Sequence, residues 1–153
     1  MDAKYINPFL SAVENVLGQF GVQGIKKGAI KVKEIMTIDK EITAFVGIVG
    51  DLRGNVAYSF NSDTAMKLVS SMMGGMPVNQ IDDMARSAVS ELSNMFLGNA
   101  INAFGTSCGN LDITPPSVVM GEDIFFILGS TTTLMINIET DAGTIEINIG
   151  LEV

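Results

Sequence analysis

The chain has 153 residues, of which 47% are hydrophobic, with a mean hydropathy of +0.37 and a formal net charge of −8. This length and composition predict one domain with a single hydrophobic core, and no apolar run is long enough to cross a membrane. The negative charge argues against binding to nucleic acid phosphates or anionic lipid. The complete absence of histidine excludes Ser-His-Asp and Cys-His nucleophiles and histidine-ligated zinc.

The single cysteine, Cys108, cannot form a disulfide within the chain. The N-terminal residues lack the apolar core of a signal peptide, so we expect a cytoplasmic protein. The sequence also contains neither a P-loop nor a dinucleotide fingerprint. An enzyme built on this chain would therefore act by positioning and hydrogen bonding, with any metal belonging to its substrate.

The first predicted element is an amphipathic helix that ends before Gly21. Asn7 is interpreted as its N-cap and Pro8 as its first helical residue, since proline is favoured at that position. Apolar residues then recur at helical spacing, namely Phe9, Val13, Val16, Leu17 and Phe20.

A short lysine-rich segment follows, with Lys26, Lys27, Lys31 and Lys33 close together. Such a cluster is compatible with a phosphate-binding patch or with a solvated loop and edge strand. We favour the edge strand, because lysine discourages unwanted pairing at the edge of a sheet.

Residues 42–49 and 55–60 are rich in β-branched and aromatic residues and predict a hairpin closed by the loop 50–54. A helix capped by residues 61–63 then runs to about Met73, where Gly74 and Gly75 end it. Methionines cluster at this point, and we interpret them as core residues rather than as a partner surface. They are Met72, Met73, Met76 and Met84.

The longest predicted helix covers residues 82–104, which contain almost no helix breaker. One broad arc of this helix is apolar and would pack against a sheet. It consists of Ile81, Ala85, Ala88, Val89, Leu92, Phe96, Ala100 and Ala103. The opposite arc is polar but made of small side chains, so another protein could approach it closely. It consists of Ser87, Ser90, Glu91, Asn94, Gly98 and Asn102.

The last third of the chain predicts an extended stretch at residues 112–117 and antiparallel strands from about residue 123 to the end. In the final strands, Leu134, Ile136 and Ile138 alternate with polar neighbours, and residues 141–143 form a turn. We expect Glu146, Asn148 and Glu152 to face solvent, because they alternate with the apolar residues of the last strand.

These elements predict an α+β fold, in which residues 1–153 form a single domain with an antiparallel β-sheet packed against long amphipathic helices. The order of helices and strands is weakly repetitive between the two halves of the chain, which suggests internal pseudo-symmetry.

The motif Ser87-x-x-x-Glu91-x-x-Asn94 resembles the signature of the CheC/CheX/FliY family of bacterial chemotaxis phosphatases. The resemblance extends to residues 64–76 (TAMKLVSSMMGGM) and 112–116 (DITPP), and covers roughly residues 40–120. The pattern is closest to the CheX form with one site, because Glu14 of the first helix is not followed by asparagine three residues later.

The resemblance implies a phosphatase that acts on the aspartyl phosphate of a CheY-type response regulator. It implies that the long helix enters the regulator's site, where Asn94 would orient the attacking water and Glu91 would pair with a cation of the regulator. Ser87, Ser90 and Gly98 would form the rim of the contact. The protein would bring no metal or cofactor of its own, and Mg²⁺ would be held by the regulator.

Two other functions remain open at this stage. The first is a binding module without catalysis, which would dock on a receiver domain or on a flagellar or adaptor partner. The second is an unrelated hydrolase that uses Cys108, although the sequence offers that thiol neither a base nor an orienting group.

A homodimer is also expected. The resemblance suggests it, and the predicted strands leave at least one sheet edge whose backbone groups need partners. A twofold axis would give the assembly two copies of the signature helix. The competing outcome is a monomer, in which the lysine-rich segment at residues 26–33 prevents pairing at the edge of the sheet.

Overall fold

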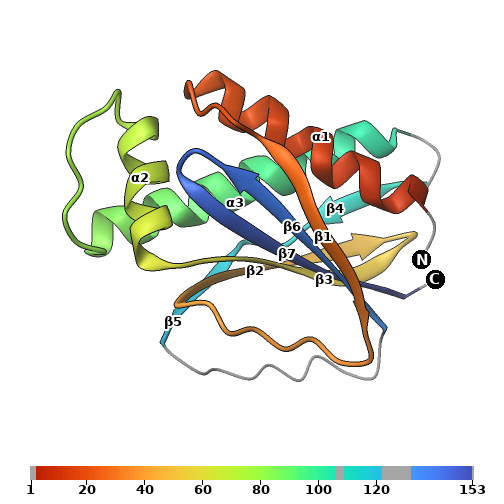
Figure 1. Ribbon diagram of the computed structural model, residues 1–153. Helices are drawn as coiled ribbons and strands as arrows, with labels where there is room; N and C mark the ends of the chain where they lie inside the picture. The colour runs from red at the N-terminus through yellow and green to blue at the C-terminus, as the bar shows by residue number, and fades with distance from the viewer. Residues whose placement is uncertain (1–2, 106–108, 122–131, 153) are drawn as a thin grey trace.

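The computed structural model describes residues 3–105, 109–121 and 132–152, except for the side chains of residues 3–5. The elements occur in the order helix, three strands, two helices and four strands, and they confirm the predicted α+β fold (Figure 1). They are α1 (Ala3–Gln19), β1 (Lys26–Lys33), β2 (Ile42–Gly50), β3 (Arg53–Phe60), α2 (Ser62–Met72), α3 (Asp83–Phe104), β4 (Leu111–Ile113), β5 (Ser117–Met120), β6 (Thr133–Thr140) and β7 (Gly143–Glu152). Cys108 and the strand residues expected at 123–131 lie outside the described residues.

The strands form one antiparallel sheet in the order β1-β6-β7-β3-β2. At the far edge, β4 and β5 pair with successive parts of β2, so that Ile48 lies opposite Ile113 and Thr43 opposite Val119. Within the predicted extended stretch, residues 112–113 end β4, Ser117 begins β5, and residues 114–116 form the connection between these two short edge strands. Thr114, at its start, exchanges hydrogen bonds with Gly47 at 2.8 and 2.9 Å.

One face of the sheet carries the main hydrophobic core. Helices α1 and α3 lie side by side across this face, and α2 sits at one end of the sheet beside the turn between β6 and β7 (Figure 1). The strands contribute alternate apolar residues to this core, including Ile136, Ile147 and the aromatic Tyr58. The prediction that Leu134, Ile136 and Ile138 face inward is confirmed.

The opposite face of the sheet is also covered, which corrects our expectation for β7. Glu146 is 7% exposed and Asn148 is fully buried, whereas only Glu152 is exposed as expected. The segment between β1 and β2 crosses this face, where its residues Met36 and Ile38 form a small second core (Figure 1). The alternation along β7 was read correctly, but nothing in β7 itself shows that a distant segment covers its polar side.

The buried carboxylate of Glu146 is compensated by polar neighbours. Asn148 Nδ2 donates to Glu146 Oε1 at 2.9 Å, and Lys33 Nζ lies 3.8 Å from the same oxygen. Lys33 also donates to the carbonyl of Thr37 at 3.0 Å, which ties the covering segment to β1. A buried charge requires such partners.

The predicted start of α1 is wrong. The helix runs from Ala3, so Pro8 lies inside it and Asn7 is not its N-cap. Ile6 packs against the core and continues the stripe of Phe9 and Val13 toward the N-terminus. This burial favours helix before Pro8, although proline removes one backbone hydrogen bond.

The N-terminus of α2 also differs from the expectation. The side chain of Asn61 makes no capping hydrogen bond. Instead, the carboxylate of Glu41 accepts from the backbone N–H of Ser62 at 3.1 Å and from its hydroxyl at 3.2 Å. The other end is as predicted, because Gly74 and Gly75 follow the helix with φ angles of 70° and 91°.

The lysine-rich segment forms β1, which has a strand neighbour on one side only within the described residues. The interpretation as an edge strand is confirmed. In the same described part of the chain, no helix combines the length and apolar character needed to cross a bilayer.

Candidate functional site

The candidate site lies on α3, which begins with a well-formed cap. The carboxylate of Asp82 accepts a hydrogen bond from the N–H of Ala85 at 2.9 Å. Asp83 in the first turn forms an ion pair with Arg86, and the negative charge of Asp83 suits the N-terminal end of the helix dipole. The helix continues for 22 residues to Phe104, and Gly105 follows it with a φ of 59°.

The two faces of α3 are close to the prediction. The buried residues are Ala85, Val89, Leu92, Ser93, Phe96, Leu97, Ala100 and Phe104. Ala88 is only half-buried and Ala103 is exposed, so both lie at the margin of the packed arc. Sequence analysis missed Ser93, which is buried because its hydroxyl donates to the carbonyl of Val89 at 2.9 Å and so needs no water.

The predicted site residues share the opposite surface of the helix. Ser87 and Glu91 are exposed, while Ser90, Asn94 and Gly98 are half-buried. Spacings of three and four residues place them along one side of a helix. We call the surface formed by these five residues the signature face.

Neither Glu91 nor Asn94 has a hydrogen-bond partner among the described residues. Because the two residues are three apart, their side chains leave the helix one turn from each other and point to the same side. The carboxylate of Glu91 and the carboxamide of Asn94 are therefore both free to meet groups of another molecule.

The helix beneath the signature face is firmly held. Phe96 contacts Tyr58 of β3 with ring centroids 5.3 Å apart, and Phe104 contacts Phe9 of α1 edge-on at 5.8 Å. On the flank, Asn15 of α1 donates to Asn99 at 3.3 Å. These contacts fix α3 against both the sheet and α1, so the signature face is presented by a rigid support.

Tyr58 is fully buried, and its hydroxyl has no hydrogen-bond partner among the described residues. Burial raises the pKa of this phenol because the charged phenolate would lose its hydration. Tyr58 therefore supports α3 as a neutral packing residue.

The described residues contain no group of three or more acidic, histidine or cysteine side chains arranged to hold a metal.

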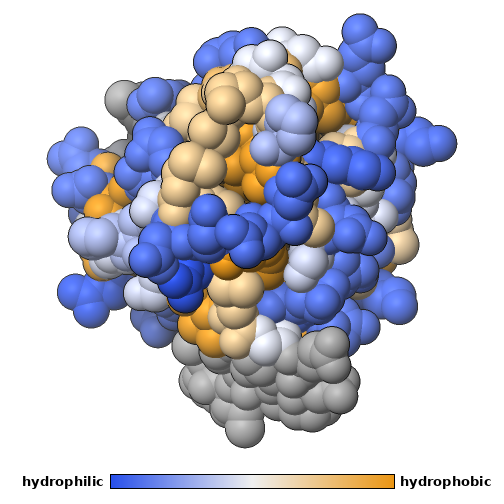
Figure 2. All heavy atoms as spheres, turned by 90° about the vertical axis from the view of Figure 1, so that its left-hand side faces the viewer, coloured by the Kyte–Doolittle hydropathy of each residue, from blue (hydrophilic) through white to orange (hydrophobic). Residues whose placement is uncertain are grey.

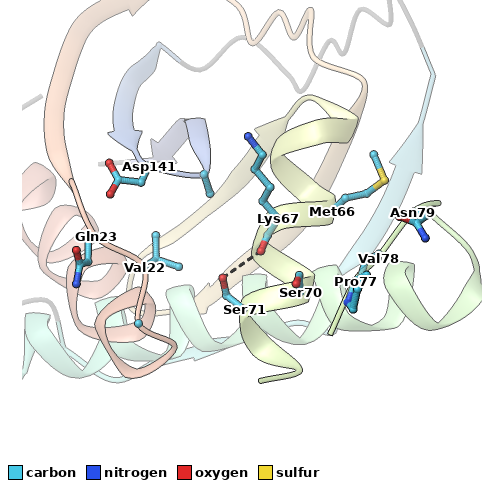
Figure 3. Close-up of a pocket in the computed structure, with 12 residues that line it drawn as sticks. Val22, Gln23, Met66, Lys67, Ser70, Ser71, Pro77, Val78, Asn79 and Asp141 are labelled. Carbon is cyan, nitrogen blue, oxygen red and sulfur yellow. Dashed lines mark hydrogen bonds between the residues drawn. The ribbon is translucent and has the colours of Figure 1, made fainter. Parts of the chain in front are cut away.

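A separate cavity of about 540 Å³ lies between the C-terminal end of α1, α2 and the turn after β6 (Figure 3). Figure 3 shows Lys67 and Met66 of α2 on one side, with Gln23 and Asp141 across from them. None of the signature residues lines this cavity. No sequence motif marked this cavity, because its wall comes from four separate segments. The predicted site is instead an open helical surface, which suits a protein substrate better than a small molecule.

Known proteins resemble this chain in sequence. The family described as Chemotaxis phosphatase CheX matches residues 42–139. The CheY-P phosphatase CheX of Thermotoga maritima is 38% identical over 125 residues, which are 81% of this chain and 80% of that protein.

Solved structures share the fold. A CheC-like superfamily protein from Shewanella has a TM-score of 0.88 at 25% identity, with both chains fully covered. The matched chain of the CheX–CheY–BeF3–Mg²⁺ complex from Borrelia burgdorferi has a TM-score of 0.82 at 25% identity, covering 97% of this chain and 98% of that one. The family match spans more than half of the sequence and the Thermotoga relative most of it, so this chain belongs to the chemotaxis phosphatase CheX family.

Proposed function

We propose that this protein hydrolyses the aspartyl phosphate of a CheY-type response regulator by presenting its signature face to the regulator's phosphorylation site. The observation that carries the proposal is that the side chains of Glu91 and Asn94 lie one turn apart on the outer side of α3, without a hydrogen-bond partner among the described residues. Membership of the CheX family supports it. So do the Thermotoga relative, which is a CheY-P phosphatase, and the Borrelia structure, in which CheX is complexed with CheY, BeF3 and Mg²⁺.

Asn94 would orient the attacking water. A carboxamide carries an acceptor oxygen and a donor N–H₂ group, so its oxygen can accept from the water and hold it in line with the phosphorus. Phosphoryl transfer passes through a loose transition state that needs positioning and charge neutralisation more than a strong base. The Mg²⁺ and the cationic groups of the regulator would supply the neutralisation.

Glu91, one turn earlier on α3, would pair with a cation at the mouth of the regulator's site. Such a pair fixes the register of two docking surfaces and speeds their encounter. Its position on the same side as Asn94 means that forming the ion pair also aims the carboxamide.

The small residues of the signature face would let the helix enter the site. An added Cβ at Gly98 would have no heavy atom within 4 Å, so the space outside the helix at this point is open. Ser87 and Ser90 have short side chains for the same purpose and would contact only the rim.

The test is the rate of dephosphorylation of a phosphorylated receiver domain at catalytic amounts of protein. Asn94→Ala should keep the fold and lose tenfold to a thousandfold in turnover, or about 1.4 to 4 kcal/mol of barrier. Asn7→Ala, which removes an exposed carboxamide from α1, is the matched control and should turn over normally.

Glu91→Gln should weaken binding and reduce its dependence on salt, because the intermolecular charge pair is lost. Glu14→Gln, at an exposed acid of α1, is its control. A folded Asn94→Ala protein with normal turnover would refute the mechanism. If the unmodified protein bound the receiver without shortening the lifetime of its phosphate, it would be a binding module instead.

A further inference from the structure

Two methionines near the start of α3 are exposed, although the sequence suggested that they belong to the core. Met76 is 60% exposed and Met84 is 50% exposed, whereas Met72 and Met73 pack against the core as expected. The other large exposed hydrophobic residues in the described part of the chain lie on or beside strands, namely Ile30, Val32, Ile35, Val49 and Met120.

Met84 belongs to the same side of α3 as the signature face. It precedes Ser87 by three residues and Glu91 by seven, which is the spacing of side chains stacked along one side of a helix. The outer surface of α3 therefore continues beyond Ser87 for one more turn, where the exposed side chain of Met84 lies beside the ion pair of Asp83 and Arg86.

The loop before α3 is fixed in place beside Met84. The hydroxyl of Ser70 donates to the carbonyl of Met76 at 2.7 Å, and the N–H of Gly75 donates to the carbonyl of Ser70 at 2.8 Å. Figure 3 shows Pro77 and Val78 of this loop standing beside Ser70 of α2. The loop does not need to become ordered when a partner binds, which lowers the entropic cost of the contact.

Met84 and this loop enclose a shallow hollow of about 280 Å³. Its lining is Pro77, Val78, Asn79, Gln80, Asp82 and Met84. Figure 2 looks onto the end of the molecule that carries α2 and this loop. It shows separate groups of hydrophobic atoms on that end, with hydrophilic residues between and around them. Three of the six residues that line the hollow are apolar and three are polar, a mixture that is usual in a protein contact.

We infer that Met84, with Pro77 and Val78, is the apolar anchor that holds the receiver domain while Glu91 and Asn94 reach its phosphorylation site. This inference rests on the proposed function and adds the residues that give the complex its affinity. The occupant of the hollow is an apolar side chain on the receiver surface that borders the phosphorylation pocket, since that surface faces the next turn of α3.

The composition of the signature face explains why such an anchor is needed. Serine, glycine, asparagine and glutamate offer little apolar area, and contact energy comes chiefly from a few buried apolar or aromatic side chains. Methionine is flexible and polarisable, so it can adapt to a partner surface. The anchor supplies affinity, and Asn94 supplies the rate.

The experiment compares Met84→Gln with Met120→Gln, a similarly exposed methionine on β5 that is 41% exposed. Glutamine has nearly the shape of methionine and forms helices well, so the fold is retained. Affinity for a receiver domain activated with BeF3 and Mg²⁺ is measured by titration, and kcat and KM are measured on the phosphorylated receiver.

We expect Met84→Gln to weaken binding and raise KM by about tenfold while kcat stays within about twofold, and Met120→Gln to match the unmodified protein. Met84→Leu should restore binding because it keeps the apolar surface. Unchanged affinity in Met84→Gln, or an equal loss in Met120→Gln, would overturn the inference and leave the role of Asn94 intact. If Met84→Gln lost affinity for the activated receiver but the unmodified protein had no turnover, the proposed function would fail and the anchor would stand.

Discussion

Gly98 allows a prediction in which stability and activity change in opposite directions. Glycine in the interior of a helix is about 0.8 to 1.0 kcal/mol less favourable than alanine. An added Cβ at position 98 meets no atom within 4 Å, so an alanine there should not be strained. Gly98→Ala should therefore stabilise the protein by nearly the full propensity difference, which raises Tm by about 2 to 4 °C for a domain of this size.

The unfavourable effect of a larger side chain at position 98 should appear only when the regulator binds. Gly98→Leu fills space that the proposed complex leaves to the partner, and overpacking of a close contact costs about 1 to 3 kcal/mol. That range corresponds to a loss of about fivefold to 150-fold in affinity, at 1.4 kcal/mol for each factor of ten. Gly98→Ala adds a single methyl group, so its affinity for the regulator should lie between those of the unmodified protein and Gly98→Leu.

The assays are urea unfolding and turnover of a phosphorylated receiver domain, measured on the same preparations. Gly18→Leu is the control, because Gly18 lies in the last turn of α1, is exposed and has no atom within 4 Å of an added Cβ. It should gain stability and keep its activity. Normal turnover in Gly98→Leu would show that the regulator does not approach this part of α3, and a loss of stability would show that the site is not open.

Two further predictions concern the core and the assembly. Because burial raises the pKa of Tyr58 above the value of about 10 in the unfolded chain, the unfolded state loses this proton first as the pH rises. The contribution of Tyr58 to the free energy of unfolding should be intact below pH 10 and fall above it by about 1.4 kcal/mol per pH unit. Tyr58→Phe should lack this decrease in urea unfolding between pH 9 and 11. An equal decrease in both proteins would contradict the assignment of this pH dependence to Tyr58. A homodimer remains our expectation from the resemblance to the CheX family, although the lysines of β1, which has a strand neighbour on one side only among the described residues, would oppose pairing at that edge. Light scattering at micromolar concentration should give twice the chain mass of 16.3 kDa. A constant mass of one chain would reject the dimer without affecting the role of Asn94.

The helical periodicity of α3 was enough to separate its packed side from its outer side. Val89, Leu92 and Phe96 repeat at the helical spacing, and all three are buried as predicted. The outer side could be recognised as a site only through the resemblance, because Glu-x-x-Asn on a helix has no chemistry of its own without a partner.

The misread features depend on residues distant in sequence. Glu146 alternates with isoleucines and so looks like a solvated residue, yet Met36, Ile38 and Lys33 cover and compensate it. The N-terminus of α2 is satisfied by Glu41, which precedes it by a whole hairpin, instead of by Asn61. Met84 was assigned to the core because methionine usually packs there, and nothing local indicated that the preceding loop leaves it exposed.

The division of α3 into two surfaces affects how this protein can evolve. Its packed residues and its outward residues alternate along 22 positions without sharing any, so a substitution in one set need not disturb the other. In the proposed complex, mutations at Ser87, Ser90 or Glu91 would change which partner is bound while the core keeps its packing. A lineage could therefore exchange one regulator for another, or lose Asn94 and keep only the docking surface, without first passing through an unstable protein. The same separation makes α3 a suitable element on which to engineer recognition of a different receiver domain.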